Sequence, residues 1–229
     1  MPRIARVVIP GCPHHVTQRG NHGQKVFFSD RDRQIYFELL RKYFEQYLVD
    51  VAGYTLMSNH THLIVVPLRK NSLAKGVGIS HNDFSRWQQV QQNQKGHLWQ
   101  SRFYSNPLDE EHYWKALRYA ELNPVRAGLV RHAWDWPWSS ARAHVTGVDE
   151  TGILNMDLWR SHFNEEQWGV YLKQRTKLQD EIELIRLSAR TGRPLGDKNF
   201  IKSLEKITGR SLLPKKRGPK FGSKRKGRG

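Results

Sequence analysis

Residues 49–66, VDVAGYTLMSNHTHLIVV, contain the pattern that decides the fold. Val49 to Met57 and Thr61 to Val66 are rich in β-branched, aromatic and aliphatic residues, a composition typical of strands. The polar pair Ser58-Asn59 between them predicts a tight connection. The segment therefore predicts a β-hairpin with at least one buried face.

A strand and a helix are predicted before this hairpin. His14–Arg19, HHVTQR, follows a run of proline and glycine breakers and predicts a short strand. Ser29 or Asp30 can cap a helix in which apolar residues recur at intervals of three and four as far as Leu48. This helix is expected to pack one face against the sheet.

A helix, a strand and a second helix are predicted after the hairpin. Ser72 to about Gln92 has helix-like content but is interrupted by Gly76 and Gly78, and Leu98–Leu108 looks extended again. From Asp109, a capping residue with acids in the next turn, to about Leu122 the sequence predicts an added helix.

The order strand, helix, strand, strand, helix, strand is that of a ferredoxin-like fold, in the α+β class. In this fold a four-stranded antiparallel sheet carries two helices on one face and leaves the other face for a ligand. The added helix that starts at Asp109 is therefore the expected place for chemistry.

The charge of the chain indicates a polyanionic partner. The formal net charge is +17 and the isoelectric point about 10.2, far from the values of an ordinary small domain. Residues 214–229 contain eight basic residues and no acidic one, which predicts a mobile, basic tail. Nucleic acid is the expected partner rather than a membrane, because the apolar stretch Leu63–Leu68 is far shorter than the roughly 20 residues that span a bilayer.

The cellular location is predicted from two weaker features. The N-terminal apolar run, Val7–Ile9, is too short for a secretory signal, and the single cysteine, Cys12, cannot form an internal disulfide. Both features indicate a cytoplasmic protein.

Two pairs of side chains have the spacing of a chemical site. His60 and His62 lie two apart on a strand, so both imidazoles point to one face and can bind one cation. Tyr119 and Asn123 lie one helical turn apart, which places a phenol beside an amide oxygen able to complete a hard-metal site. Satisfied or surface histidines, a packing tyrosine and a helix-ending asparagine are the alternative interpretations.

Five segments carry a more specific pattern: HHVTQRGNHGQKVFF (14–28), LMSNHTHLIVVP (56–67), GHLWQSRFYS (96–105), RYAELNPVRAGLV (118–130) and WPWSSARAH (136–144). In this order they resemble the IS200-like tyrosine transposases, and especially the REP-associated branch, over about residues 1–146. The triplet His60-Thr61-His62 matches the histidine–hydrophobic–histidine motif of that family, with Thr61 in place of a hydrophobic residue. Residues 191–210 are similar to an extension that some members carry.

The resemblance implies a domain organisation as well. Residues 1–150 would form the catalytic domain, residues 151–213 a helical, basic C-terminal extension, and residues 214–229 a disordered basic tail. We expect the protein to act as a monomer or a homodimer.

The resemblance also implies an enzyme that nicks and joins single-stranded or hairpin DNA. His60 and His62, with Asn123 as third ligand, would hold Mg²⁺ or Mn²⁺ against the scissile phosphate. Tyr119 would attack phosphorus and leave a 5′-phosphotyrosine link and a free 3′-hydroxyl. Basic side chains are expected to bind DNA phosphates: Arg3, Arg6, Arg19, Arg102, Arg118, Arg126, Lys215, Lys216 and Arg217.

Three other functions are compatible with the sequence. A nucleic-acid-binding protein without catalysis would use the same sheet and basic tail. A metal-dependent nuclease would use the histidines to activate water and would leave no covalent protein–DNA product. A rolling-circle replication or relaxase-type relative shares the histidine motif, although the short chain favours the transposase branch.

Overall fold

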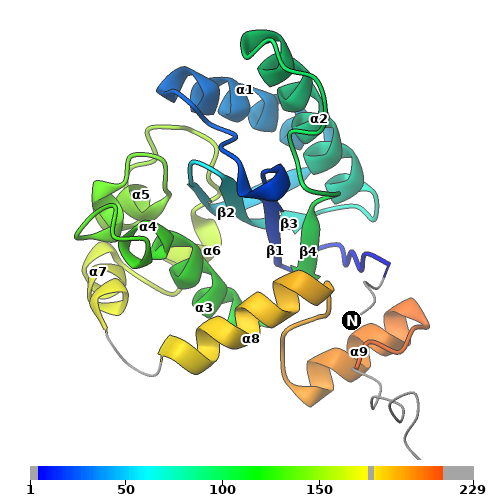
Figure 1. Cartoon of the computed structure of the whole chain (residues 1–229). Coiled ribbons are helices and arrows are strands. Elements are labelled where there is room, and N and C mark those ends of the chain that lie inside the picture. Colours follow the sequence, from blue (N-terminus) through cyan, green and yellow to red (C-terminus); the bar gives the residue numbers. More distant parts are fainter. Residues whose placement is uncertain (1–4, 175–177, 214–229) are drawn as a thin grey trace, which may run out of the picture.

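The computed structural model describes residues 5–174 and 178–213, and the features that follow refer to these residues. A four-stranded antiparallel sheet separates two groups of helices (Figure 1). Its strands are β1 (His14–Arg19), β2 (Val49–Leu56), β3 (His60–Pro67) and β4 (Tyr104–Pro107). They lie in the order β2-β3-β1-β4, which confirms the predicted ferredoxin-like fold.

The helices α1 (Asp30–Tyr47) and α2 (Ser72–Gln91) cover one face of the sheet (Figure 1). The Ser29 side chain caps α1, as the sequence predicted. The predicted interruption of the second helix is wrong, because α2 is continuous through both glycines. A Cβ atom at Gly76 would lie 3.1 Å from Val49 Cγ2, so this glycine lets α2 approach its neighbours closely.

The last strand is shorter than predicted, because only the second half of residues 98–108 pairs within the sheet. The first half bonds instead to the end of β1 and to the loop that follows it. The Asn21 amide donates to the Leu98 carbonyl, and the Gln100 amide donates to the Arg19 carbonyl. The loop after β1 begins with a short 3₁₀ helix at Asn21–Gly23. The bonds hold the loop beside the ends of β1 and β3.

The helix α3 (Glu110–Glu121) lies on the opposite face of the sheet, and α4 (Asn123–Arg126) follows it directly. The Asp109 carboxylate accepts a hydrogen bond from the His112 amide and so caps α3, as predicted. A Cβ atom at Gly53 would clash with Leu117 Cδ1, so glycine at this point of β2 lets α3 pack closely against the sheet.

Short helices enclose the outer side of α3. They are the 3₁₀ helix Ala133–Asp135, α5 (Ala141–Thr146), α6 (Asp157–Arg160) and α7 (Glu165–Lys173). Trp159 and Trp168 are fully buried in the same apolar cluster as Leu117 of α3. The limits of the predicted domains stay a prediction, but residues 151–173 share a core with the sheet and α3.

The C-terminal extension is helical, as predicted, and contains α8 (Leu178–Thr191) and α9 (Lys198–Thr208). α8 runs beside α3 and across the ends of β1 and β4, while α9 lies near the N-terminal segment (Figure 1). Leu204 of α9 packs with Val7 and Ile9 of that segment. The predicted tail, residues 214–229, lies outside the described residues, as do Arg3, Lys215, Lys216 and Arg217.

Within residues 5–174 and 178–213, every helix is too short or too polar to cross a lipid bilayer.

Candidate active site

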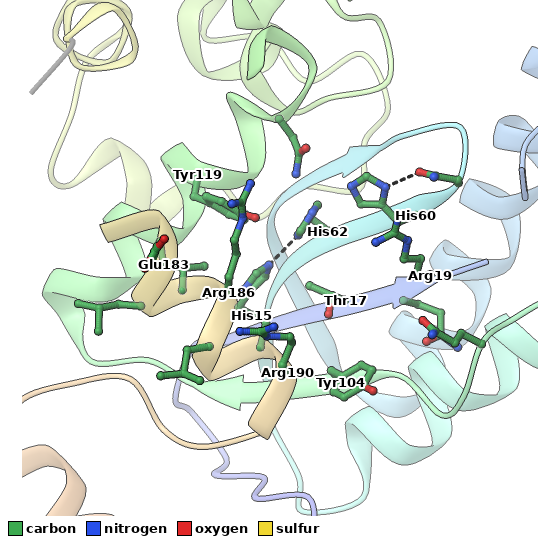
Figure 2. Close-up of a pocket in the computed structure, with 18 of the residues that line it drawn as sticks. His15, Thr17, Arg19, His60, His62, Tyr104, Tyr119, Glu183, Arg186 and Arg190 are labelled. Carbon is green, nitrogen blue, oxygen red and sulfur yellow. Dashed lines mark hydrogen bonds between the residues drawn. The ribbon is translucent and has the colours of Figure 1, made fainter. Parts of the chain in front are cut away.

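A cavity of about 1160 Å³ lies between the sheet and α8 (Figure 2). It is lined by all four residues that were predicted to carry chemistry: His60, His62, Tyr119 and Asn123. A further histidine that was not predicted, His15 of β1, lies among them. The fold therefore brings two strands and the consecutive helices α3 and α4 together at a single site.

Strand alternation explains why the histidines meet. In the antiparallel register Thr17 pairs with His62, and Arg19 pairs with His60. Residues of the same parity therefore share one face, so His15 of β1 points to the same side as both histidines of β3. The neighbouring residue of β3, Leu63, points to the other side and is fully buried under α1 and α2.

Hydrogen bonds orient two of the imidazoles. His60 Nδ1 lies 2.6 Å from Asn59 Oδ1, and because an amide oxygen only accepts, this nitrogen carries the proton. The lone pair of His60 is then on Nε2. His62 Nδ1 lies 2.8 Å from His15 Nε2, and if His62 donates this bond its Nε2 is also free for a ligand.

All three imidazoles are in environments that favour the neutral form. Burial lowers the pKa of His60 to about 4, with a contribution from Arg19, while the Asn123 side chain opposes the shift. Burial also lowers the pKa of His15 to about 3 and that of His62 well below its usual value. A neutral imidazole is the form that binds a metal ion.

Tyr119 lies against the histidines and a guanidinium group. Its ring meets the rings of His62 and His15 edge to face, with centroids 5.5 and 6.0 Å away. The Arg126 guanidinium lies 4.1 Å from the centroid of the Tyr119 ring. Burial lowers the pKa of Arg126 to about 10, so this group stays positively charged beside the phenol at neutral pH.

The donor set fits a divalent cation only if an amide or a substrate oxygen takes part. No group of three His, Cys, Asp or Glu side chains within the described residues has the arrangement of a metal site. The nearest carboxylate along α3, Glu121, is fully buried and accepts hydrogen bonds from Ser140 (2.6 Å) and Trp168 (2.8 Å). The imidazoles of His60 and His62 and the Asn123 oxygen are the donors on the Tyr119 side of the cavity, while the carboxylates that line it, Asp180 and Glu183, come from α8.

Two of the arginines predicted to bind DNA lie at this site. Arg19 is exposed and lines the cavity, and Arg126 adjoins it through the Tyr119 ring. Their positions suit contacts with a phosphate that enters the cavity.

The other described arginines that were predicted to bind DNA do not lie at the cavity. Arg118 is buried, hydrogen-bonded to the Gln174 carbonyl, and stacked 4.7 Å from the Tyr171 ring centroid. Arg6 stacks 3.7 Å from the centroid of the Phe103 ring, and Arg102 is exposed on the loop before β4. The contacts of Arg118 and Arg6 are structural ones.

Several residues of the site gave no usable signal in the sequence. His15 lies in the predicted strand HHVTQR, but only the register of β1 with β3 shows that it faces His62. The helix α8 adds Glu183, Arg186 and Arg190 to the cavity although it follows Tyr119 by more than fifty residues. Such distant contacts depend on tertiary packing.

Comparison with known protein families identifies the family of this chain. The model of the family described as "Transposase IS200 like" matches residues 9–123, just over half of the chain. The chain belongs to the IS200-like transposase family. The match includes both histidines of β3, Tyr119 and Asn123, and it ends well before α8.

Comparison with solved structures gives two further similarities. One is described as a REP-associated tyrosine transposase bound to a REP hairpin; it shares 19% identity with a TM-score of 0.52, over 66% of this chain and 90% of that one. A crystal structure from Deinococcus radiodurans, described as that of a transposase candidate, has 14% identity and a TM-score of 0.37, over 56% and 98%. No curated protein matches the chain significantly.

Proposed function

We propose that this member of the IS200-like transposase family cleaves and rejoins single-stranded DNA, with Tyr119 as the nucleophile. The observation that carries the proposal is the edge-to-face contact of Tyr119 with His62, 5.5 Å between centroids, inside a cavity that His60 and Asn123 also line. A phenol and the donors for a cation thus face the same space. The relative described as bound to a REP hairpin supports hairpin DNA as the form of the substrate.

The reaction exchanges one phosphodiester bond for another. Tyr119, having lost its phenolic proton to water, attacks the scissile phosphorus, and the bond from phosphorus to the 3′-oxygen breaks. The 3′-oxygen takes up a proton, and the downstream strand stays joined to the tyrosine through its 5′-phosphate. Attack by a 3′-hydroxyl on this linkage releases Tyr119 and rejoins DNA, so the bond energy is kept.

The surrounding side chains position the reacting groups. His60, His62 and Asn123 would hold a Mg²⁺ or Mn²⁺ ion, which would supply a Lewis acid to offset the negative charge of the phosphate. Asn59 fixes the ring of His60, and His15 fixes that of His62. Arg126 adds a positive charge next to the attacking oxygen.

A covalent-adduct assay tests the proposal. Hairpin DNA with a single-stranded flank, labelled at its 3′ end, is incubated with the protein and Mn²⁺ and run on a denaturing gel. We expect the label to move with the protein, and Tyr119→Phe to abolish this adduct while DNA binding stays within about threefold, because the change removes one hydroxyl and no packing volume.

Tyr113→Phe is the matched control. Tyr113 lies on the same helix and is buried, and its hydroxyl has no hydrogen-bond partner among the described residues, so its removal should change nothing. Adduct formation by Tyr119→Phe would refute the proposal. Cleavage without any adduct would indicate a nuclease that uses water, and binding without cleavage a non-catalytic DNA-binding protein.

A further inference from the structure

We propose that α8 forms the second wall of the path of the DNA strand, with Arg186 and Arg190 binding phosphates next to the scissile one. The inference rests on the proposed function, because the strand in question is the one that Tyr119 cuts. α8 lies beyond residues 9–123, which match the family model, so this wall is a feature of the C-terminal extension.

Apolar contacts hold α8 against the catalytic helix. Ile182 and Ile185, three residues apart, are buried in one cluster with Tyr119, and Leu195 packs against this cluster. Farther along α3, the Lys115 ammonium lies 3.4 Å from a Glu181 carboxylate oxygen. The position of α8 is thus determined by the same helix that carries the nucleophile.

The chain after α8 is fixed to the sheet and to the start of α3. The Leu195 amide donates to the Pro107 carbonyl of β4 (2.9 Å), and the Asp109 amide donates to the Leu195 carbonyl (3.1 Å). The Asp197 amide donates to the carboxylate of Asp109, the residue that caps α3 (2.8 Å). α8 is therefore anchored beyond its C-terminal end as well as along its length.

The face of α8 that lines the cavity carries three charged side chains in a row. Glu183, Arg186 and Arg190 are spaced by three and four residues, so they share one side of the helix. In Figure 2 they project from α8 on the side of the cavity that faces His15 and Tyr119. The acid Asp180 also lines the cavity, near the start of α8.

The arginines of this row lie close to a further positive charge, that of Arg126. Within the described residues, Arg186 and Arg190 form no ion pair, although Glu183 lies within one turn of Arg186. Arg186 is close enough to Arg126 to oppose its positive charge, and it contributes to the lowered pKa of Arg126. Guanidinium groups from α4 and α8 therefore lie close together near Tyr119.

An anion between these groups would relieve their repulsion, and a phosphodiester has the required chemistry. Guanidinium groups bind phosphate oxygens through paired, charge-assisted hydrogen bonds. The spacing of Arg186 and Arg190 along α8, one helical turn, allows each to meet a different phosphate of one extended strand. Glu183 in the same row would repel that strand. Removing the charge of Glu183 should therefore strengthen DNA binding, whereas removing the charge of Arg186 should weaken it.

The experiment measures binding of a fluorescent single-stranded oligonucleotide by anisotropy, over a range of KCl concentrations, with the full chain. Arg186→Gln should weaken binding about tenfold and lower the slope of log affinity against log salt by about 0.7, the value for one phosphate contact. Glu183→Gln should strengthen binding by a few fold. Lys198→Gln, which removes one exposed positive charge of α9, is the control for net charge and should have little effect.

Three results would overturn the inference: unchanged binding in both α8 variants, equal losses in Arg186→Gln and Lys198→Gln, or weaker binding in Glu183→Gln. The first would mean that α8 only covers the cavity. The adduct assay separates this failure from that of the proposed function. If wild type forms adducts while the α8 variants bind DNA normally, the proposed role of α8 is refuted and the proposed function stands. If the α8 variants shift DNA affinity in opposite directions but no adduct forms, the proposed cleavage by Tyr119 is refuted and the role of α8 stands.

Discussion

The two faces of the sheet are built from the same strands but have opposite characters. On one face, Leu63 and Val65 of β3 are fully buried with Val16 of β1 under α1 and α2. On the other face, the alternate residues His60 and His62 face a cavity. Adjacent residues of one strand thus belong to the apolar core and to the candidate site, respectively.

Because the two faces differ in this way, substitutions one position apart in a strand should affect either the stability of the protein or its activity. The apolar face gains free energy from area removed from water, so its residues determine whether the protein folds. The polar face carries buried imidazoles in unfavourable surroundings, which hydrogen bonds and a bound cation can compensate. Three experiments test how completely the two roles are divided.

The largest expected effect is on the polar face. His60→Ala or His62→Ala should reduce cleavage about a thousandfold or more, because a Lewis acid at the phosphate contributes several kcal/mol. For His60, which is partly exposed, the free energy of unfolding should stay within about 0.5 kcal/mol of wild type. Cleavage is measured in Mn²⁺ and in excess chelator, and unfolding in urea. Cleavage by wild type that persists in chelator would contradict a metal role for these histidines.

The matching change on the apolar face is Leu63→Ala, at the residue that follows His62 in β3. Leu63 is fully buried, so its truncation should lower the free energy of unfolding by about 2–5 kcal/mol through lost burial and a residual cavity. Affinity of the folded variant for Mn²⁺, measured by titration calorimetry well below the unfolding temperature, should not change. A loss of Mn²⁺ affinity with little loss of stability would show that the two faces are not independent.

A smaller effect is expected at His15, which contacts His62, a proposed metal ligand, and is not itself proposed to bind the metal. His15→Gln should weaken Mn²⁺ binding about 10- to 100-fold, because it disturbs the partner of His62 Nδ1. His14→Gln is the control: His14 is equally buried, but it lies on the other face and bonds to the Cys12 carbonyl. Equal Mn²⁺ affinities for wild type and His15→Gln would mean that His15 only fills space.

Local sequence patterns predicted most of the secondary structure. The hairpin of β2 and β3, the strand at His14–Arg19 and the caps at Ser29 and Asp109 were predicted because they depend on residues close in the chain. The break at Gly76 was predicted wrongly. Helix propensity there is outweighed by the close packing of α2, which favours a residue without a side chain.

The class of the fold and the residues at the centre of the candidate site were predicted from the sequence alone. Spacing alone placed His60 and His62 on one face of a strand, and Tyr119 and Asn123 one turn apart on a helix, because these periodicities are properties of the backbone. The residues that the family model matches include both pairs.

The other groups that lie beside these residues depend on the tertiary structure. The register of β1 with β3 brings His15 to His62, and the packing of Ile182 and Ile185 on Tyr119 brings the arginines of α8 to the cavity. Arg118, equally basic in the sequence, is instead directed toward Tyr171. These contacts join residues far apart in the chain, and they are selected by burial and shape across the whole molecule, which a local pattern does not encode.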